Sequence, residues 1–334
     1  MINKKETNNF MKLFLRTVIF LSLLTGLAAV AQTPAWPNKP VKIVNNFPAG
    51  GPSDILARAI AEKLQTNSGH AVIVDNKPGA GGNIGATEVA KAAGDGTTVF
   101  VGIDTAFTVN PHIFPTIPFK LGNKKGDLKP LVIISSNGLL LGTSAAKGIR
   151  SMGELISKGK SEGVNFSSGG AGSPGHLGVS LFSQAGALKI THVPYRGNSP
   201  AVLALVSGEV DGGILSVSGM LPHVKSGKIV PVALTSRQRS KALPDIPTVK
   251  ELGYPELENE VLTVMMVPGD TPEPTMTAMK KAVIEVLAQP ALRDRLVALD
   301  MVYEGLTDVA ATKRLTDLSV RYAKIVKATN MKVE

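Results

Sequence analysis

The segment VKIVNNFPAGGPSDILARAIAEKL, Val41 to Leu64, contains the unit from which most of the chain is built. It starts as a β-rich run typical of a buried strand, passes through a loop of small residues, and continues with apolar residues at three- and four-residue spacing from Ile55 onward. That spacing predicts a helix. Glycines at the start of a helix let a ligand approach its unpaired N–H groups, which attract anions. The segment therefore predicts an α/β chain and a place where an anion can bind.

The same succession of strand, glycine-bearing loop and helix recurs along the chain. Strands alternating with helices predict parallel sheets covered on both faces, and there is no fixed-period repeat. The further strand-like runs are AVIVDN (71–76), TTVFVGID (97–104), LVIISS (131–136), LLLGTS (139–144), VNFSSGG (164–170), ITHVPYRG (190–197), VDGGILSV (210–217) and IVPVALTS (229–236).

Two adjacent strand-like runs between Asp127 and Ala145 indicate a domain crossing, because only Ser135 to Gly138 separates them. A return is expected near VLTVMMVPGDTPEP (261–274), after which the chain becomes helical. We expect two doubly wound α/β domains joined by two crossover strands, with a ligand cleft between them. Domain 1 would comprise residues 32–134 and 263–334, and domain 2 residues 135–262.

The first 31 residues are typical of a secretory signal peptide. Basic residues precede an apolar run of about 13 residues, which is shorter than the roughly 20 that a membrane-spanning helix needs. An A-x-A cleavage site ends at Ala31, so we expect a periplasmic protein released by cleavage of residues 1–31. An uncleaved membrane anchor is the alternative.

The composition limits the kinds of molecule that the protein is expected to bind. There is no cysteine, which suits an exported bacterial protein and excludes disulfides and thiolate chemistry. The formal net charge is +10, but the basic residues are scattered and aromatic residues make up only 4% of the chain. Nucleic acid is therefore not expected. A mildly positive field favours a small anionic ligand, although a solvated basic surface has the same composition.

Three helix starts share one pattern of small residues with serine and proline. Ser53 follows AGGP, Ser173 follows SSGGAG, and Ser199 follows YRGN. Serine is a favoured N-cap and proline is tolerated in the first turn, so these helices should begin at the carboxyl ends of strands, where ligands bind in open α/β sheets. Capped helices after glycine turns are also routine structural features.

Other motifs give weaker evidence for nucleotide binding, catalysis or a metal site than the helix starts give for an anion site. GAGGNIG (79–85) has its third glycine out of register with the dinucleotide fingerprint, and AGSPG (171–175) departs from a nucleophile elbow at its first residue and at Pro174. The five histidines show no metal-ligand spacing. An exported α/β enzyme, either a serine hydrolase using Ser173 or a nucleotide-dependent enzyme, is the alternative to a binding protein.

Seven ordered blocks give the chain a resemblance to a known family. It resembles the periplasmic substrate-binding proteins of tripartite tricarboxylate transporters, which include the Bordetella uptake (Bug) proteins. The blocks are FPAGGPSD (47–54), DNKPGAGGNIGATEVAKAAGDGTT (75–98), VNPHIF (109–114), SSGGAGSPGHL (167–177), HVPYRGNSPAV (192–202), LPHVKSGKI (221–229) and ALTSRQRSKALPDIPTVKELGYP (233–255).

The resemblance implies a type II periplasmic binding protein fold that closes around a small organic mono- or dicarboxylate, without catalysis, cofactor or metal. Its partners would be the large and small membrane subunits of the transporter, or a sensor receptor, and the protein would act as a monomer. The ligand's carboxylate would be held mainly by backbone N–H groups of two loops. The first loop comprises Phe47, Pro48, Ala49, Gly50, Gly51, Ser53 and Asp54. The second loop comprises Ser167, Ser168, Gly169, Gly170, Ala171, Gly172 and Ser173.

The far end of the ligand is expected to meet Asp104, Thr105, Arg196, Gly197 and Ser216. Two departures from the family pattern bear on this end. Asn45 and Asn46 stand where a proline is common, and we expect them to make the pocket mouth more polar. Residues 261–264, VLTV, stand where the family usually carries an aromatic pair.

Overall fold

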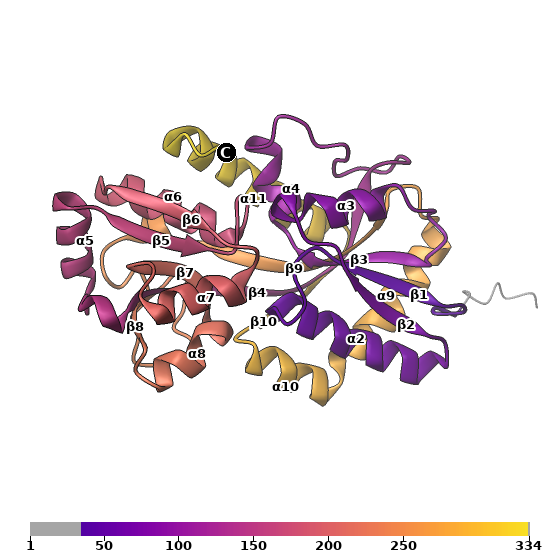
Figure 1. Ribbon diagram of the computed structural model, residues 1–334. Helices are drawn as coiled ribbons and strands as arrows, with labels where there is room; N and C mark the ends of the chain where they lie inside the picture. Colours follow the sequence, from indigo (N-terminus) through magenta and orange to yellow (C-terminus); the bar gives the residue numbers. More distant parts are fainter. Residues whose placement is uncertain (1–34, 333–334) are drawn as a thin grey trace, which may run out of the picture. The chain divides into compact units, whose positions relative to one another are not determined.

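The computed structural model describes residues 35–332, and the predicted signal peptide at residues 1–31 lies outside them. The described strands form one hydrogen-bonded sheet (Figure 1). They are β1 (Val41–Asn45), β2 (Val72–Asn76), β3 (Thr98–Ile103), β4 (Leu128–Ser144), β5 (Val164–Ser168), β6 (Ile190–Pro194), β7 (Gly212–Ser216), β8 (Ile229–Leu234), β9 (Glu260–Pro268) and β10 (Val302–Leu306).

Helices follow most of the strands. The α-helices are α2 (Pro52–Ser68), α3 (Asn83–Ala90), α4 (Thr105–Thr108), α5 (Met152–Ser161), α6 (Pro174–Gly186), α7 (Asn198–Ser207), α8 (Val217–Lys225), α9 (Glu273–Ala288), α10 (Pro290–Ala298) and α11 (Asp308–Thr329). Short 3₁₀ turns occupy Ala80–Gly82, Asn110–His112, Ala145–Lys147 and Pro255–Leu257. None of the described helices is both long and apolar enough to cross a membrane.

The sheet has the strand order β2-β1-β3-β9-β4-β7-β5-β6, with β8 and β10 also paired to β4. The flanking strands are parallel, as predicted: β1 to β2 and β3, and β5 to β6 and β7. The prediction of parallel pairing is wrong at the centre, where β4 and β9 pair antiparallel. These two strands are antiparallel because β4 carries the chain from one set of parallel strands to the other, and β9 runs in the opposite direction to bring it back.

The two strand-like runs predicted between Asp127 and Ala145 are one continuous strand, β4. Its first part pairs with β9 as far as Gly138, and its remainder pairs with β7 from Leu139 onward. The predicted crossing is therefore present in the hydrogen-bond pattern. Ala35–Glu334 cluster as a single compact unit, and the division into domains at 134/135 and 262/263 stays a prediction.

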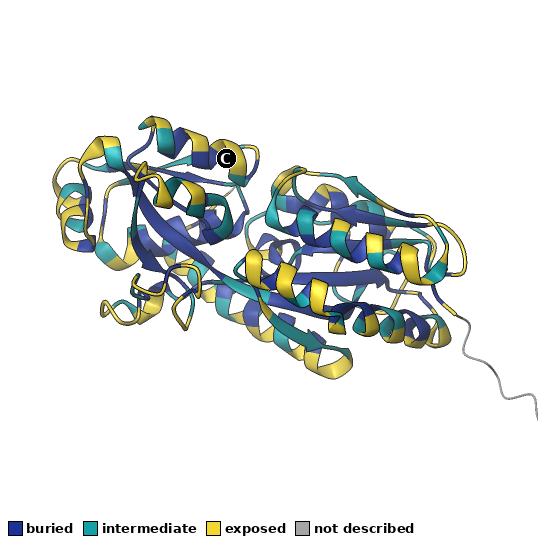
Figure 2. Ribbon diagram, turned by 90° about the horizontal axis from the view of Figure 1, so that it is seen from below, coloured by how far each residue is buried: buried dark blue, intermediate teal, exposed yellow. Residues whose placement is uncertain are grey.

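Figure 2 shows strands that are mostly buried and helices with exposed outer faces. Side chains that alternate along the strands contribute to three apolar cores. Ile43 points into a core with α2, α9 and α10, whereas its neighbour Val44 points into a core shared with α3, α6 and α11. Leu140 packs into a third core with α7 and α8. All three of these strand residues are essentially unexposed. Helices therefore cover the sheet on both faces, which leaves the strand ends and loops for ligand contact.

Asp104 fastens the return strand β9 to the loop after β3. Its carboxylate is fully buried and accepts hydrogen bonds from the Leu262 N–H (2.9 Å) and the Thr108 hydroxyl (2.8 Å). Burial raises the pKa of Asp104 to about 7, outweighing these two hydrogen bonds, and the nearby Glu260 charge raises it further. Asp104 therefore holds a proton under mildly acidic conditions.

We expect the free energy of unfolding to reveal this proton. Because the pKa of Asp104 in the folded chain lies above its ordinary value of 3.8, the folded state binds a proton that the unfolded chain has lost between about pH 4 and pH 7. Stability contributed by Asp104 thus decreases as pH rises through that interval, by on the order of a few kcal/mol. Urea unfolding of the wild type and Asp104→Asn across pH 4–8 measures the difference. Parallel pH profiles would show that Asp104 titrates normally.

Candidate functional site

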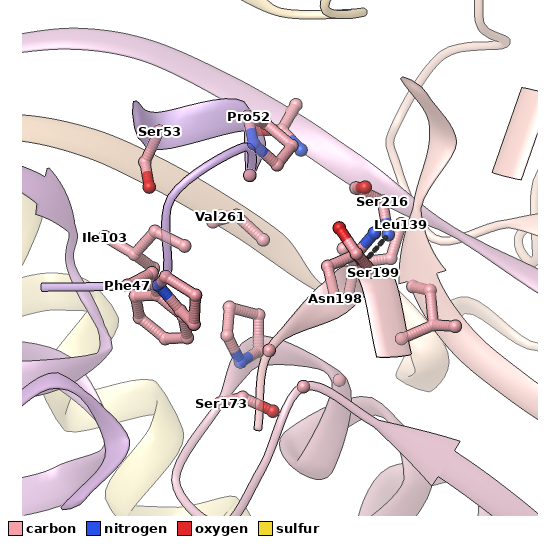
Figure 3. Close-up of a pocket in the computed structure, with 18 of the residues that line it drawn as sticks. Phe47, Pro52, Ser53, Ile103, Leu139, Ser173, Asn198, Ser199, Ser216 and Val261 are labelled. Carbon is pink, nitrogen blue, oxygen red and sulfur yellow. Dashed lines mark hydrogen bonds between the residues drawn. The ribbon is translucent and has the colours of Figure 1, made fainter. Parts of the chain in front are cut away.

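A pocket of about 120 Å³ lies where four helices begin and the two crossing strands meet. Figure 3 shows Phe47 and Ser53 facing Asn198, Ser199 and Ser216 across it, with Val261 behind. The lining is Phe47, Pro48, Ala49, Gly51, Pro52, Ser53, Ile103, Asn137, Leu139, Gly169, Ser173, Pro174, Gly175, Gly197, Asn198, Ser199, Pro200, Ile214, Leu215, Ser216, Val261, Thr263 and Met301.

The first wall is the loop between β1 and α2. Gly51, in an extended conformation, is the N-cap of α2, and Pro52 occupies the first turn. The prediction that Ser53 caps this helix is therefore wrong, because the chain enters the helix two residues earlier. Ser53 lies inside the first turn, where its N–H has no intrahelical acceptor. Proline has no N–H to satisfy, so the free donors of this turn belong to Ser53 and Asp54.

Asp54 braces this loop from outside the pocket. Its carboxylate accepts hydrogen bonds from the Gly50 N–H (2.9 Å), Arg58 (3.1 Å) and Asn76 (2.9 Å). Burial opposes its ionisation, but these hydrogen bonds together hold the pKa of Asp54 below its ordinary value. Neither Gly50 nor Asp54 lines the pocket. The Gly50 N–H is already bonded, and its left-handed φ of +77° is what glycine supplies.

Asn45 and Asn46 do not make the pocket mouth polar, contrary to the sequence-based expectation. Both are almost completely buried. The Asn45 amide donates to the Val101 carbonyl (2.8 Å), and the Asn46 side chain both accepts from and donates to the backbone of Ile103. These side chains turn inward because the neighbouring strand β3 offers backbone partners there. They fix where the first wall stands.

The second wall is the loop between β5 and α6. Ser173 is the N-cap of α6 and accepts from the His176 N–H (3.3 Å), which confirms the predicted cap. The Gly172 N–H donates to Nδ1 of His176 (3.2 Å), and Ser168 contacts His192 (2.6 Å). From this predicted loop only Gly169 and Ser173 line the pocket. The predicted residues outside the lining are Ser167, Ser168, Gly170, Ala171 and Gly172.

The two histidines behind this loop carry no charge at neutral pH. Their rings stack with centroids 4.1 Å apart. Burial lowers the pKa of His176 to about 3, with the neighbouring His192 adding to the effect, and burial lowers the pKa of His192 to about 4. They shape the loop as neutral hydrogen-bonding groups. No group of three or more potential metal ligands occurs among residues 35–332.

Two further helix starts complete the ring. Gly197 is the N-cap of α7, so Ser199, predicted as a cap, lies inside the first turn instead. Ser216 is the N-cap of α8 and accepts from the Gly219 N–H (3.3 Å). The Asn198 side chain accepts from the Ser216 N–H (3.0 Å) and so joins these two helix starts (Figure 3). Gly197 and Ser216, both predicted at the site, line the pocket.

The helix starts are close together. A Cβ placed on Gly169 would lie 3.6 Å from the Asn198 nitrogen, and one on Gly197 would lie 2.8 Å from the Pro48 side chain. The starts of α2, α6 and α7 therefore surround one place. Each helix start has N–H groups without intrahelical partners and the positive end of a helix dipole. An anion can be held there by backbone alone.

The floor of the pocket was predicted from the sequence only at Ser216. It consists of three cross-strand pairs: Ile103 opposite Thr263, Asn137 opposite Val261, and Leu139 opposite Ser216. The floor residues alternate along β4 and β9, since every second side chain faces the same side. That alternation was visible in the sequence, but the register between β4 and β9 was not.

The remaining predicted contacts lie outside the pocket lining. Asp104 is fully buried against β9, and Thr105 is 3% exposed beside it. Arg196 is exposed to solvent and does not line the pocket. Consequently no lining residue among residues 35–332 carries a formal charge. Any attraction for an anion comes from the helix starts.

Comparison with known proteins places this site in a family. Residues 56–331 match the model of the tripartite tricarboxylate transporter family receptor. Protein BugT of Bordetella pertussis is 32% identical over 317 residues, which cover 92% of this chain and 95% of BugT.

Solved structures of other proteins also resemble this chain. Periplasmic binding protein BugD has a TM-score of 0.82 at 26% identity, covering 90% of this chain and all of BugD. A Rhodopseudomonas palustris protein solved with adipate has a TM-score of 0.80 at 27% identity, covering 89% and 100%. MatC from the same species, with bound malate, has a TM-score of 0.79 at 27% identity, covering 87% and 100%.

The predicted fold class is thereby confirmed: the chain has the mixed α/β fold of the type II periplasmic binding proteins. Within that class, it belongs to the tripartite tricarboxylate transporter receptor family, with the Bug proteins as homologues.

We expect Gly169→Ala to weaken carboxylate binding without unfolding the protein. The added methyl group would meet only ordinary contacts, 3.6 Å from the Asn198 nitrogen, and it would take up space beside that N–H, which a ligand needs in order to approach it. Loss of one or two such hydrogen bonds to a charged group corresponds to about tenfold or more in affinity. Calorimetric titration measures the loss.

Gly153→Ala is the matched control, because Gly153 lies in α5 with open space around it. Equal affinities for the two variants would show that Gly169 does not lie at the ligand-binding site.

Proposed function

We propose that this chain is a periplasmic solute-binding protein that captures a small organic carboxylate for a tripartite tricarboxylate-type transporter and performs no chemistry. The observation that carries the proposal is the ring of four helix starts around one uncharged pocket. The family membership and the adipate and malate bound by two structural relatives support the class of ligand.

The proposed ligand contacts are revised from the sequence-based set. The carboxylate is bound by first-turn N–H groups of three helices, from Ser53 on α2, Gly175 on α6, and Asn198 and Ser199 on α7. Each of these four residues lines the pocket. Backbone donors fixed by helices do not need to be reorganised when the ligand arrives, and partial helix charges attract the anion without a competing cation. Such a site binds and releases its ligand without altering it.

Capture and release are proposed to use the two crossing strands as a hinge. The pocket takes Phe47, Ile103 and Thr263 from the residues assigned to domain 1, and Gly169, Gly197 and Ser216 from those assigned to domain 2. A ligand bridging both groups favours the closed arrangement by its differential affinity. We propose delivery to the large and small membrane subunits on the basis of the family, and export on the basis of the signal peptide predicted at residues 1–31. The protein acts as a monomer.

A thermal-shift screen of small carboxylates tests the proposal. The purified protein is first unfolded and refolded to remove any ligand retained from the host. A carboxylate at 100 times its dissociation constant should add about 2.7 kcal/mol to the free energy of unfolding. The corresponding amides serve as uncharged controls and should give no shift. Equal shifts with acid and amide would contradict carboxylate capture.

Hydrolase activity is tested separately with Ser173. Its hydroxyl accepts from the His176 N–H and lies 3.5 Å from the Ser168 hydroxyl, so it acts as a helix cap. We expect stoichiometric binding and no product from ester or amide substrates, for the wild type and Ser173→Ala alike. Turnover by the wild type that is lost in Ser173→Ala would establish an enzyme instead.

A further inference from the structure

We infer that the ligand carries one carboxylate on a largely apolar body, and that the matching dicarboxylate binds this chain more weakly. The inference rests on the proposed function, since it concerns the same pocket. It is carried by the arrangement of the pocket itself, in which the donors gather in one place and the remaining surface is neutral.

The donors form a single anion site. The start of α7 lies against the α6 loop at Gly169 and against the α2 loop at Pro48. The start of α8 adjoins these three helix starts, because the Asn198 side chain at the start of α7 accepts a hydrogen bond from the Ser216 N–H at the start of α8. A dicarboxylate of extended chain needs a second set of donors some distance from the first. Among the described residues, three of the four helix starts at the pocket donate to the first carboxylate, and the fourth, that of α8, lies beside α7 rather than at a distance from it.

The floor favours a hydrocarbon body. Ile103, Val261 and Leu139 alternate there with the short neutral side chains of Thr263, Asn137 and Ser216. Ile214 and Met301 add further apolar surface to the lining. Removing methylene groups from water against such a surface is favourable, whereas removing a second carboxylate from water without a cation is strongly unfavourable.

The basic side chains beyond the floor are not part of the pocket lining. They line a second, larger hollow, which shares only Asn137 and Met301 with the pocket. Arg314 in that hollow is 2.6 Å from Glu260, and Arg321 donates to the Glu258 carbonyl. Arg196, the cation adjacent to the pocket in sequence, is exposed and outside the lining. A second carboxylate on the floor would therefore lack a charged partner.

Asn137 adds a polar preference. Its amide nitrogen donates to the Gly138 carbonyl (3.0 Å), which fixes the orientation of the amide group. Its Oδ1 is buried and has no hydrogen-bond partner within residues 35–332. An oxygen acceptor is satisfied by a hydroxyl or N–H group and repels a carboxylate. Asn137 lines both the pocket and the second hollow, so a ligand body that reaches its Oδ1 from the pocket would do so with a neutral donor.

Matched pairs of acids test the inference by calorimetry on protein refolded without ligand. The pairs are butanoate and succinate, hexanoate and adipate, and octanoate and suberate, with 6-hydroxyhexanoate added to probe Asn137. We expect the tightest monocarboxylate to bind at least about tenfold more tightly than its dicarboxylate. Dicarboxylates binding as tightly or more tightly would overturn the inference and leave carboxylate capture intact. If none of the seven acids bound, both the inference and the proposed function would fail.

Variants of the floor provide an independent readout. Val261→Lys places an ammonium group on the floor opposite Asn137, and we expect it to reverse the preference, raising adipate affinity relative to hexanoate by about tenfold or more. Val261→Met keeps the floor apolar and should keep the preference for hexanoate. Arg196→Gln should leave both affinities unchanged. A loss of adipate binding in Arg196→Gln would show instead that Arg196 supplies the second cation.

Discussion

Helix starts must have their first N–H groups satisfied from outside the helix, and this requirement governs the structure of the site. α2, α6, α7 and α8 each follow the carboxyl end of a strand, namely β1, β5, β6 and β7. Parallel pairing brings the ends of β5, β6 and β7 to one edge of the sheet. The antiparallel steps through β9 and β4 make β1 run in the opposite direction, so the start of α2 faces the other three starts across the pocket. Side chains cap two of these starts, through Ser173 and Ser216. Donors left inside the first turns are satisfied by water or by a ligand.

The crossing strands determine what lies beneath those donors. Because β4 carries the chain out and β9 carries it back, their antiparallel register decides which side chains become the floor. Val261 and Asn137 meet there, and Asp104 fixes β9 from behind through the Leu262 N–H. A shift of β9 by one residue in this register would turn Val261 and Thr263 away from the pocket. The polarity of the floor is thus a consequence of strand pairing.

Local patterns were enough to predict much of this from the sequence. The strand, loop and helix units, the crossing strands and the Ser173 cap all depend on neighbouring residues. Asn45 and Asn46 could not be placed, because their partners lie on β3, and Asn46 bonds a residue 57 positions away. The floor depends on register between β4 and β9, which no local pattern encodes. Gly51 rather than Ser53 caps α2, since the extended backbone at Gly51 lets the helix begin at Pro52.

The most direct measurement is a crystal structure of the protein with hexanoate bound. Backbone capture predicts carboxylate oxygens within about 3 Å of the N–H groups of Ser53, Gly175 and Asn198 or Ser199, with the hydrocarbon chain against Val261 and Leu139. A carboxylate bound instead to the guanidinium of Arg196, or lying outside the ring of helix starts, would contradict it.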